Sequence, residues 1–257
     1  MTKPTALITG ASSGIGLDFA RLFAADGWDV ALVARSESRL REIAADLERQ
    51  FAVTARVIVA DLARPHAARD VMLQLDGPVE ALVNNAGFGL AGEFARTDLD
   101  GELNMIQVNI AALTELTKLV LPQMVARRSG RIVNVASTAA FQPGPLMAVY
   151  YATKAYVLSF SEAIADELRD SGVTVTALCP GPTATNFAVA ADMTDRRLFT
   201  VTKPMSSEAV ARKGYAAMKR GKRIEITGAR NKFMAQTIRV SPRRLVTAVV
   251  RRLQEKA

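Results

Sequence analysis

The sequence has almost none of the side chains on which several large classes of protein depend. Its 257 residues include one cysteine, Cys179, and one histidine, His66. A single cysteine cannot form a disulfide within the chain, so a cytoplasmic setting is the default expectation. A lone histidine excludes multi-histidine metal sites and effectively excludes a histidine-based triad, so no metal is expected. We expect Cys179 to be packed at a strand end and His66 to begin a helix.

Long apolar runs are also missing. No run approaches the roughly 18 residues that a membrane-spanning helix needs. The strand-like run Thr5–Thr9 follows the first four residues directly, so no hydrophobic signal segment is expected ahead of it. What the chain does contain is 49% hydrophobic residues, enough for a large core. The interpretation is a single domain over residues 1–257.

The net charge of +8 is placed unevenly along the chain. Residues 203–257 contain 15 lysines and arginines but only 3 acidic residues, whereas residues 1–202 contain 18 basic and 22 acidic residues. The excess positive charge therefore belongs to the C-terminal fifth. Apart from this charge, no motif supports nucleic-acid binding, and none is expected.

Apolar, β-branched runs alternate with helix-like stretches such as Glu37–Phe51 and residues 97–127. The strand-like runs are residues 6–9, 30–34, 56–60, 81–83, 131–135, 173–178 and 223–227. This alternation predicts an α/β fold: one doubly wound Rossmann-type domain with a parallel sheet flanked by helices. We expect Pro122 to interrupt or kink the long helix, and Gly172 to close the helix that begins near Tyr150.

A glycine-rich loop lies between the first strand and a helix expected from Ile15 to about residue 26. Gly10, Gly14 and Gly16 permit a tight turn and close approach of the backbone to a pyrophosphate, and the helix N-terminus supplies unpaired N–H groups. The bland alternative is a structural glycine turn. The residues of this loop predicted to bind a cofactor are Gly10, Ser12, Ser13, Gly14, Ile15 and Gly16.

The end of the second strand bears on which cofactor is bound. A carboxylate there would favour NAD, whereas an arginine accommodates the 2′-phosphate of NADP. The strand ends at Ala34 and Arg35, with no carboxylate before Glu37. Arg35, with help from Arg39, predicts NADP(H); the alternative is an Arg35 that merely caps a solvated loop.

Tyr150 and Lys154 are four residues apart on a predicted helix, so they share one face. A free phenol is a poor base at neutral pH, and a fixed positive neighbour favours the phenolate and lowers the pKa. The pair therefore predicts proton transfer by Tyr150.

The TGxxxGxG loop, Ser137 thirteen residues before Tyr150, and the Tyr150–Lys154 pair together resemble the short-chain dehydrogenase/reductase family, over about residues 5–230. The resemblance implies that Tyr150 is the proton donor or acceptor and that Ser137 polarises the substrate oxygen. It also implies that Lys154 binds the nicotinamide ribose and that Asn109 positions a water in the proton relay. The further cofactor contacts that it implies are Asp61, Leu62, Asn85, Ala86, Gly87, Tyr150, Lys154, Pro180, Gly181, Thr183 and Thr185.

The regions that line substrates in this family are unusually apolar in this chain. They contain Phe88, Leu90, Phe94, Phe141, Pro143 and Met147, and, in a substrate lid over about residues 183–205, Phe187, Met193, Leu198 and Phe199. Aromatic and methionine side chains give adaptable apolar surface, so we expect a lipophilic carbonyl or secondary alcohol as substrate. The alternative is ordinary packing of the lid.

The end of the chain departs from the common family pattern. Residues 229–257 predict a basic helical extension with helices over 231–240 and 242–256. The last helix has an apolar stripe flanked by arginines. Such a helix can cover the sheet, lie on an anionic membrane, dock an acidic partner or form a homodimer.

The sequence thus predicts an NADP(H)-dependent oxidoreductase of the carbonyl reductase type that moves a hydride between nicotinamide and a carbonyl or secondary alcohol. The alternative from a different class is a non-catalytic NADP(H)-binding sensor that acts through its basic tail. Retention of Tyr150, Lys154, Ser137 and Asn109 argues against the sensor. Substrate identity, direction and oligomeric state stay open.

Overall fold

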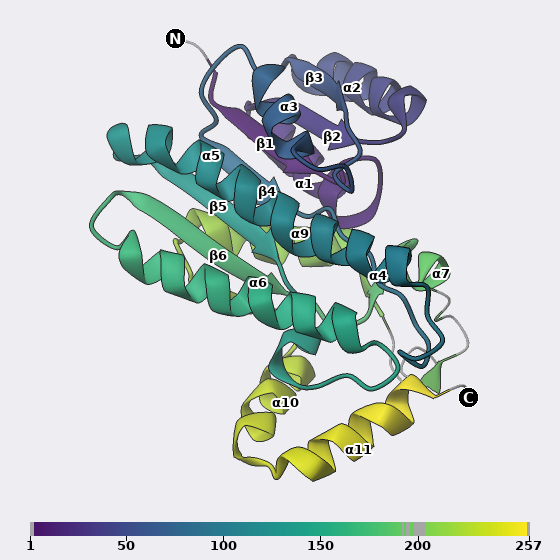
Figure 1. Ribbon diagram of the computed structural model, residues 1–257. Helices are drawn as coiled ribbons and strands as arrows, with labels where there is room; N and C mark the ends of the chain where they lie inside the picture. The colour runs from purple at the N-terminus through teal and green to yellow at the C-terminus, as the bar shows by residue number, and fades with distance from the viewer. Residues whose placement is uncertain (1–2, 192, 194–195, 198–203, 256–257) are drawn as a thin grey trace.

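The first strand, β1 (Thr5–Thr9), lies near the middle of a seven-stranded parallel sheet in the computed structural model of the protein (Figure 1). The structure describes residues 3–191, 193, 196–197 and 204–255. Within them the strand order is β3-β2-β1-β4-β5-β6-β9. The other strands are β2 (Asp29–Ala34), β3 (Ala55–Val59), β4 (Ala81–Asn84), β5 (Gly130–Val135), β6 (Val173–Cys179) and β9 (Ile224–Ile226). The order reverses between β1 and β4, which is where open α/β sheets bind ligands.

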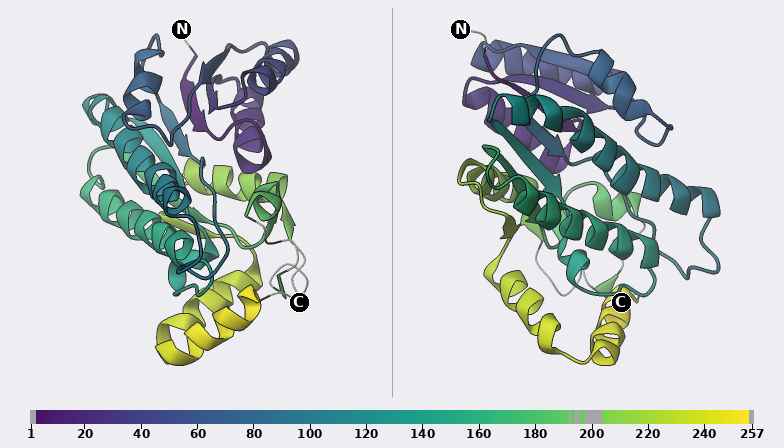
Figure 2. Two further views of the ribbon diagram at one scale, coloured as in Figure 1. Left: turned by 45° about the vertical axis from the view of Figure 1, so that its right-hand side comes forward. Right: turned by 60° about the vertical axis from the view of Figure 1, so that its left-hand side comes forward.

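Helices cover both faces of the sheet (Figures 1 and 2). One face packs against α1 (Gly14–Ala25), α2 (Glu37–Phe51) and α9 (Ser207–Lys219). The other packs against α3 (Ala67–Leu73), α5 (Leu113–Ala126) and α6 (Ala148–Glu167). The doubly wound parallel fold predicted from the sequence is confirmed.

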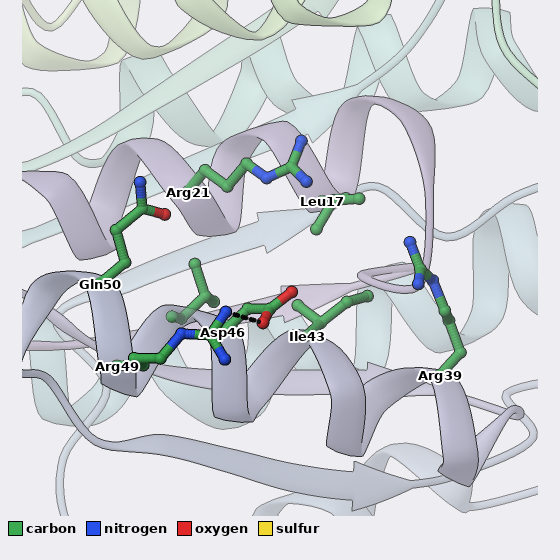
Figure 3. Close-up of a pocket in the computed structure, with 8 residues that line it drawn as sticks. Leu17, Arg21, Arg39, Ile43, Asp46, Arg49 and Gln50 are labelled. Carbon is green, nitrogen blue, oxygen red and sulfur yellow. Dashed lines mark hydrogen bonds and ion pairs between the residues drawn. The ribbon is translucent and has the colours of Figure 1, made fainter.

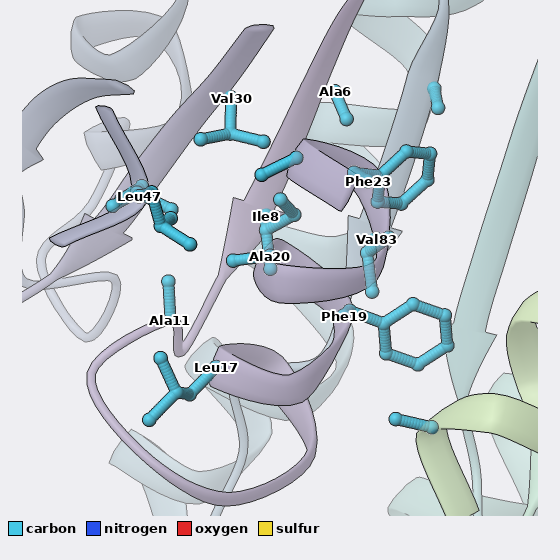
Figure 4. Packing of buried hydrophobic residues seen from close by; sticks show 14 of the residues in the cluster. Ala6, Ile8, Ala11, Leu17, Phe19, Ala20, Phe23, Val30, Leu47 and Val83 are labelled. Carbon is cyan, nitrogen blue, oxygen red and sulfur yellow. The ribbon is translucent and has the colours of Figure 1, made fainter. Parts of the chain in front are cut away.

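The alternation of side chains along β1 explains the two layers. Ile8 packs with Phe19 and Phe23 of α1, as Figure 4 shows, whereas Leu7 belongs to the core on the opposite face. The Phe23 ring also meets the Tyr215 ring of α9 edge to face, with centroids 4.9 Å apart. These contacts fix α1 against the sheet, and the N-terminal end of α1 carries the glycine loop that follows β1.

The long helix predicted over residues 97–127 has three parts: α4 (Leu99–Ile106), a π-helix (Gln107–Ala112) and α5. Pro122 does not interrupt the helix, since α5 continues through that residue, and a kink there stays a prediction. Irregularity appears instead at the π-helix, which carries Asn109; such turns are frequent at functional sites. Gly172 does not close α6 directly, because the helix ends at Glu167 and Gly172 lies in the following turn at φ +79°.

Two helices follow the last strand, α10 (Ala229–Val240) and α11 (Arg243–Gln254), as predicted. They lie at the end of the domain opposite α2 and β3 (Figures 1 and 2). The segment before them contains α7 (Phe187–Ala190) and the short parallel pair β7 (Thr183–Ala184) and β8 (Met205–Ser206). Among the described residues, no helix combines the length and apolar character that crossing a membrane requires.

The minor expectations for Cys179 and His66 are confirmed. Cys179 is fully buried at the end of β6, and His66 caps the start of α3.

Candidate active site

The glycine loop is fixed in place from the neighbouring strand. The side-chain amide of Asn85 donates to the carbonyl oxygens of Thr9 at 2.9 Å and Gly10 at 3.3 Å, and the Asn85 and Ala86 N–H groups donate to the Thr9 hydroxyl. A Cβ at Gly10 would lie 2.7 Å from Asn85 Nδ2, so only glycine fits there. The predicted residues Asn85 and Ala86 thus hold the loop, and Thr9 is an anchor that motif reading did not single out.

The start of α1 is open for an anion. Its N-cap residue Ser13 is exposed and makes no side-chain capping bond, so first-turn N–H groups remain available at the positive end of the helix dipole. Gly14 has φ +55°, and a Cβ there would lie 3.0 Å from Thr185 Cγ2. Ser12 and Ile15 flank this position half-buried. A pyrophosphate fits this arrangement of backbone donors beside Thr185.

Arg35 and Arg39 are both exposed beyond the end of β2. Arg39 lies at one end of a groove of about 440 Å³ between α1 and α2 (Figure 3), and its guanidinium pairs with Glu42 at 2.8 Å. No ion pair within the described chain involves Arg35. Arg35 is therefore the freer of the two to bind a phosphate. Beyond β3, the Asp61 carboxylate accepts from the Ala63 N–H at 3.1 Å, and Leu62 is buried.

Asn109 is buried and held on two sides. Its side-chain amide donates to Phe88 O and to Thr153 Oγ1, both at 3.0 Å, and its oxygen accepts from Phe88 N at 3.1 Å. Thr153 in turn donates to the Tyr150 carbonyl at 2.7 Å. Asn109 therefore joins the π-helix to α6 and to the loop that follows β4. One lone pair of its side-chain oxygen remains to accept a hydrogen bond from a water.

Lys154 lies beneath Tyr150 on α6. Its ammonium donates to the Val135 carbonyl at 2.8 Å and lies 5.8 Å from the centroid of the Tyr150 ring. A Cβ at the exposed Gly87 would lie 2.9 Å from Asn109 Oδ1 and 3.5 Å from Lys154 Nζ. Glycine at this position leaves the backbone free to meet a ribose and nicotinamide next to Lys154.

Burial dominates the electrostatics of the pair. It raises the pKa of Tyr150 well above its usual value near 10, although a hydrogen bond from Ser137 lowers it in part. It also lowers the pKa of Lys154 from 10.5 to about 8. The expected lowering of the Tyr150 pKa by Lys154 is thus not found, because removal from water penalises both charged forms. Tyr150 is a neutral phenol at neutral pH, the form that can donate a proton.

The segments around Ser137 complete the edge of the site. Ser137 Oγ accepts from the Ala139 N–H at 3.1 Å and approaches the carbonyl of the buried Pro180 at 3.5 Å. After Gly181, the Thr183 hydroxyl donates to the Gly181 carbonyl at 2.9 Å, and Thr185 Oγ1 accepts from the Phe187 N–H at 3.2 Å. All four catalytic candidates and the carboxyl ends of β1, β4, β5 and β6 therefore meet at one edge of the sheet.

Comparison with known proteins decides the family. The family model described as short chain dehydrogenase matches residues 4–195. The chain belongs to the short-chain dehydrogenase family. Among the described residues, no cluster of three or more His, Cys, Asp or Glu side chains could hold a metal ion.

Individual relatives of the family give the same result. The chain is 34% identical to a short-chain dehydrogenase from Sphingobium yanoikuyae in complex with NADPH, with 91% and 92% of the two chains covered and a TM-score of 0.83. It is 31% identical to the bulky-bulky ketone specific alcohol dehydrogenase from Comamonas testosteroni, with 93% of each chain covered and a TM-score of 0.79. It is 35% identical to the human very-long-chain 3-oxoacyl-CoA reductase over 71% of this chain and 60% of that protein. The matched stretch thus spans about three fifths of the length of such curated relatives.

In this short-chain dehydrogenase the surroundings of Tyr150 are apolar, as predicted. One buried cluster contains Met147, Tyr150, Tyr151 and Met193, with Phe88, Leu90 and Phe187 packed against it. The Phe187 ring lies 5.2 Å from the Tyr150 ring. A Cβ at Gly89 would lie 3.2 Å from Tyr150 Cδ2, so this glycine leaves room beside the phenol.

Three of the residues expected to line the substrate do not join this cluster. Phe94 is 65% exposed, Phe141 packs against a different cluster, and Pro143 is half-buried outside it. Phe94 points away because its loop follows the surface between β4 and α4, which spacing does not reveal. Leu198 and Phe199 lie outside the described residues.

The apolar cluster also includes Val246 and Val250 of α11, which motif reading did not assign to the site. Together with Gln254 they form the buried face of that helix, at the i, i+4, i+8 spacing. The sequence shows this stripe, yet it does not show which surface the stripe meets. The C-terminal extension therefore packs against the same apolar cluster as Tyr150.

Proposed function

We propose that the protein is an NADP(H)-dependent carbonyl reductase that acts on lipophilic ketones or aldehydes. The observation that carries this proposal is the neutral, buried phenol of Tyr150, hydrogen-bonded by Ser137 and next to Lys154, within an apolar cluster. A bound nicotinamide supplies the hydride.

The residues of the chain provide the proton and the orientation. Ser137 donates a hydrogen bond to the substrate oxygen, and Tyr150 donates its proton to that oxygen as charge develops. A proton returns to Tyr150 through Lys154 and a water that donates a hydrogen bond to the Asn109 side-chain oxygen. With a secondary alcohol the same groups act in reverse, for which Tyr150 must first lose its proton. The raised pKa of Tyr150 keeps the phenol protonated, which is the form that reduction requires.

The choice of NADP(H) rests on Arg35 at the end of β2, where an NAD-binding protein carries a carboxylate. The NADPH complex of the Sphingobium relative supports the same choice. We expect Arg35→Ser to weaken NADPH binding about 10-fold to 100-fold, since a charge-assisted hydrogen bond is lost, and to leave NADH binding unchanged.

The measurement is fluorescence titration with each cofactor. Arg41→Ser is the matched control, because Arg41 is an exposed arginine on α2, the helix that follows Arg35, and pairs with Glu37 at 2.6 Å. If Arg41→Ser weakened NADPH binding as much as Arg35→Ser, Arg35 would not be the residue that binds the 2′-phosphate. The same would follow if Arg35→Ser weakened NADH binding as much as NADPH binding.

The lipophilic substrate rests on the cluster around Tyr150 and on the names of two relatives, which act on bulky ketones and very-long-chain 3-oxoacyl-CoA. We expect NADPH oxidation with a series of ketones to show KM falling as the alkyl chain lengthens, about threefold to fourfold per buried CH₂. A KM independent of chain length contradicts a lipophilic site. Tight NADPH binding without turnover of any carbonyl favours the sensor instead.

Contact of the basic extension with a membrane or an acidic partner stays a prediction. So do the homodimer, the cytoplasmic setting and the single domain over residues 1–257. The α10–α11 sequence contains seven lysines and arginines, all exposed, and no acidic residue. Its exposed apolar side chains include Phe233, Val240, Leu245 and Val249. This combination suits an anionic membrane surface or an acidic partner.

A further inference from the structure

A buried glutamine connects the end of the chain to the catalytic helix. Gln254, the last residue of α11, is 1% exposed, and its side-chain amide donates to the Tyr151 hydroxyl at 2.6 Å. Tyr151 follows Tyr150 on α6, and the two rings meet edge to face with centroids 6.0 Å apart. Tyr151 is also buried, so its hydroxyl needs such a partner.

Tyr151 also holds the loop between Ser137 and Tyr150. The Gln142 side chain lies close enough to the Tyr151 hydroxyl to lower its pKa in part, and the Tyr151 ring fills the space where a Cβ of Gly144 would lie. The same loop ends at Met147, which packs in the cluster around Tyr150. One phenol therefore joins α11, α6 and the loop that borders the reacting groups.

The backbone at the end of α11 makes a second connection. The Gln254 carbonyl accepts from Arg196 Nη1 at 2.5 Å, and the Glu255 carbonyl accepts from the Arg197 N–H at 3.1 Å. Arg196 is 7% exposed and its own N–H donates to Met193, a member of the apolar cluster. Gln254 thus contacts two segments near the apolar cluster: its side chain bonds to Tyr151 and its carbonyl to Arg196.

We propose that Gln254 is a positioning residue for substrate binding, which acts through Tyr151 to hold the apolar wall beside Tyr150. The inference rests on the proposed carbonyl reductase function. It assigns α11 a role that surface charge does not suggest: the buried face of the helix shapes the substrate site, while its arginines face outwards. Gln254 touches neither the reacting atoms nor the cofactor contacts.

The test is a double-mutant cycle. Gln254→Leu keeps the volume and the backbone carbonyl but removes the amide donor, and Tyr151→Phe keeps the ring but removes its hydroxyl. Each is expected to raise KM for a bulky ketone about 5-fold to 10-fold, the worth of one buried hydrogen bond, with kcat and NADPH affinity within about twofold. The double variant should show about the same KM as either single variant, because both remove one interaction.

Thr247→Val on the same helix is the control, since the Thr247 hydroxyl donates to the Arg243 carbonyl within α11. Its KM should not change. The proposal would be overturned if the increase in KM of the double variant equalled the product of the two single increases. It would also be overturned by an unchanged KM in a Gln254→Leu protein that remains folded. If Gln254→Leu fails to fold, the milder Tyr151→Phe decides alone.

Hydrogen exchange gives a readout independent of turnover. If Gln254 positions this border, its loss should increase exchange at the Met147, Arg196 and Arg197 amides, which donate to Gly144, Met193 and Glu255. Unchanged protection at all three would overturn the proposal even if the ketone assay finds no substrate. Increased exchange in a protein without turnover would uphold the positioning role and contradict only the proposed reaction.

Discussion

Tyr150→Phe is expected to lower kcat/KM for carbonyl reduction by about 10²-fold to 10⁴-fold, the usual worth of a positioned general acid. The substitution removes one hydroxyl and keeps the ring that packs against Phe187 and Tyr151. The apolar cluster and the cofactor edge should therefore stay intact. NADPH affinity and the thermal midpoint are expected to stay close to those of the unmodified chain.

The assay is NADPH oxidation with the best ketone of the series, together with a fluorescence titration of NADPH. Tyr156→Phe is the matched control on α6, because Tyr156 is 37% exposed and its hydroxyl bonds to Thr114 at 2.9 Å. It should retain full activity. Turnover of Tyr150→Phe within tenfold of the unmodified chain would mean that another group supplies the proton.

Features that depend on local spacing could be predicted from the sequence. The i, i+4 relation of Tyr150 and Lys154 places both on one face of α6, and both are buried at the site as a result. The strand-like runs correspond to β1–β6 and β9 because near-continuous apolar runs are what a sheet covered on both faces requires. Such patterns are encoded within a few residues.

Features that depend on distant partners could not be predicted. The π-helix around Asn109 is held by Phe88 and Thr153, which are 21 and 44 residues away in sequence. The pairing of Gln254 with Tyr151 spans 103 residues. An apolar stripe predicts a buried face of α11 but not the surface that it covers.

The predicted lowering of the Tyr150 pKa is wrong because burial also depends on distant parts of the chain. A neighbouring ammonium lowers the pKa of a phenol, and the sequence shows that neighbour. Burial raises it, and the degree of burial follows only from the assembled fold. Here burial is the largest effect on the pKa of Tyr150, and it also makes the charge on Lys154 costly.

This cost leads to a second large effect. Lys154→Met is expected to reduce kcat/KM at least 100-fold, since it removes the group that we propose binds the ribose and returns the proton. The same substitution should raise the thermal midpoint at pH 7 by a few degrees. The pKa of Lys154 is lowered from its ordinary value of 10.5 to about 8 in the folded chain. Below pH 8 the folded chain therefore carries a buried ammonium, which costs a few kcal/mol of stability. Loss of the bond from the ammonium to Val135 offsets about 1.5–3 kcal/mol of that gain.

The pH dependence separates this explanation from a simple packing effect. In the unmodified chain, stability should rise between pH 8 and pH 10.5, where the unfolded chain still binds the proton that the folded chain has released. The advantage of Lys154→Met in thermal unfolding should therefore shrink across this window. Lys118→Met, on the exposed face of α5, should show neither effect. A Lys154→Met chain that is destabilised equally at pH 7 and pH 10 would mean that the hydrogen bond to Val135 outweighs the cost of burying the charge.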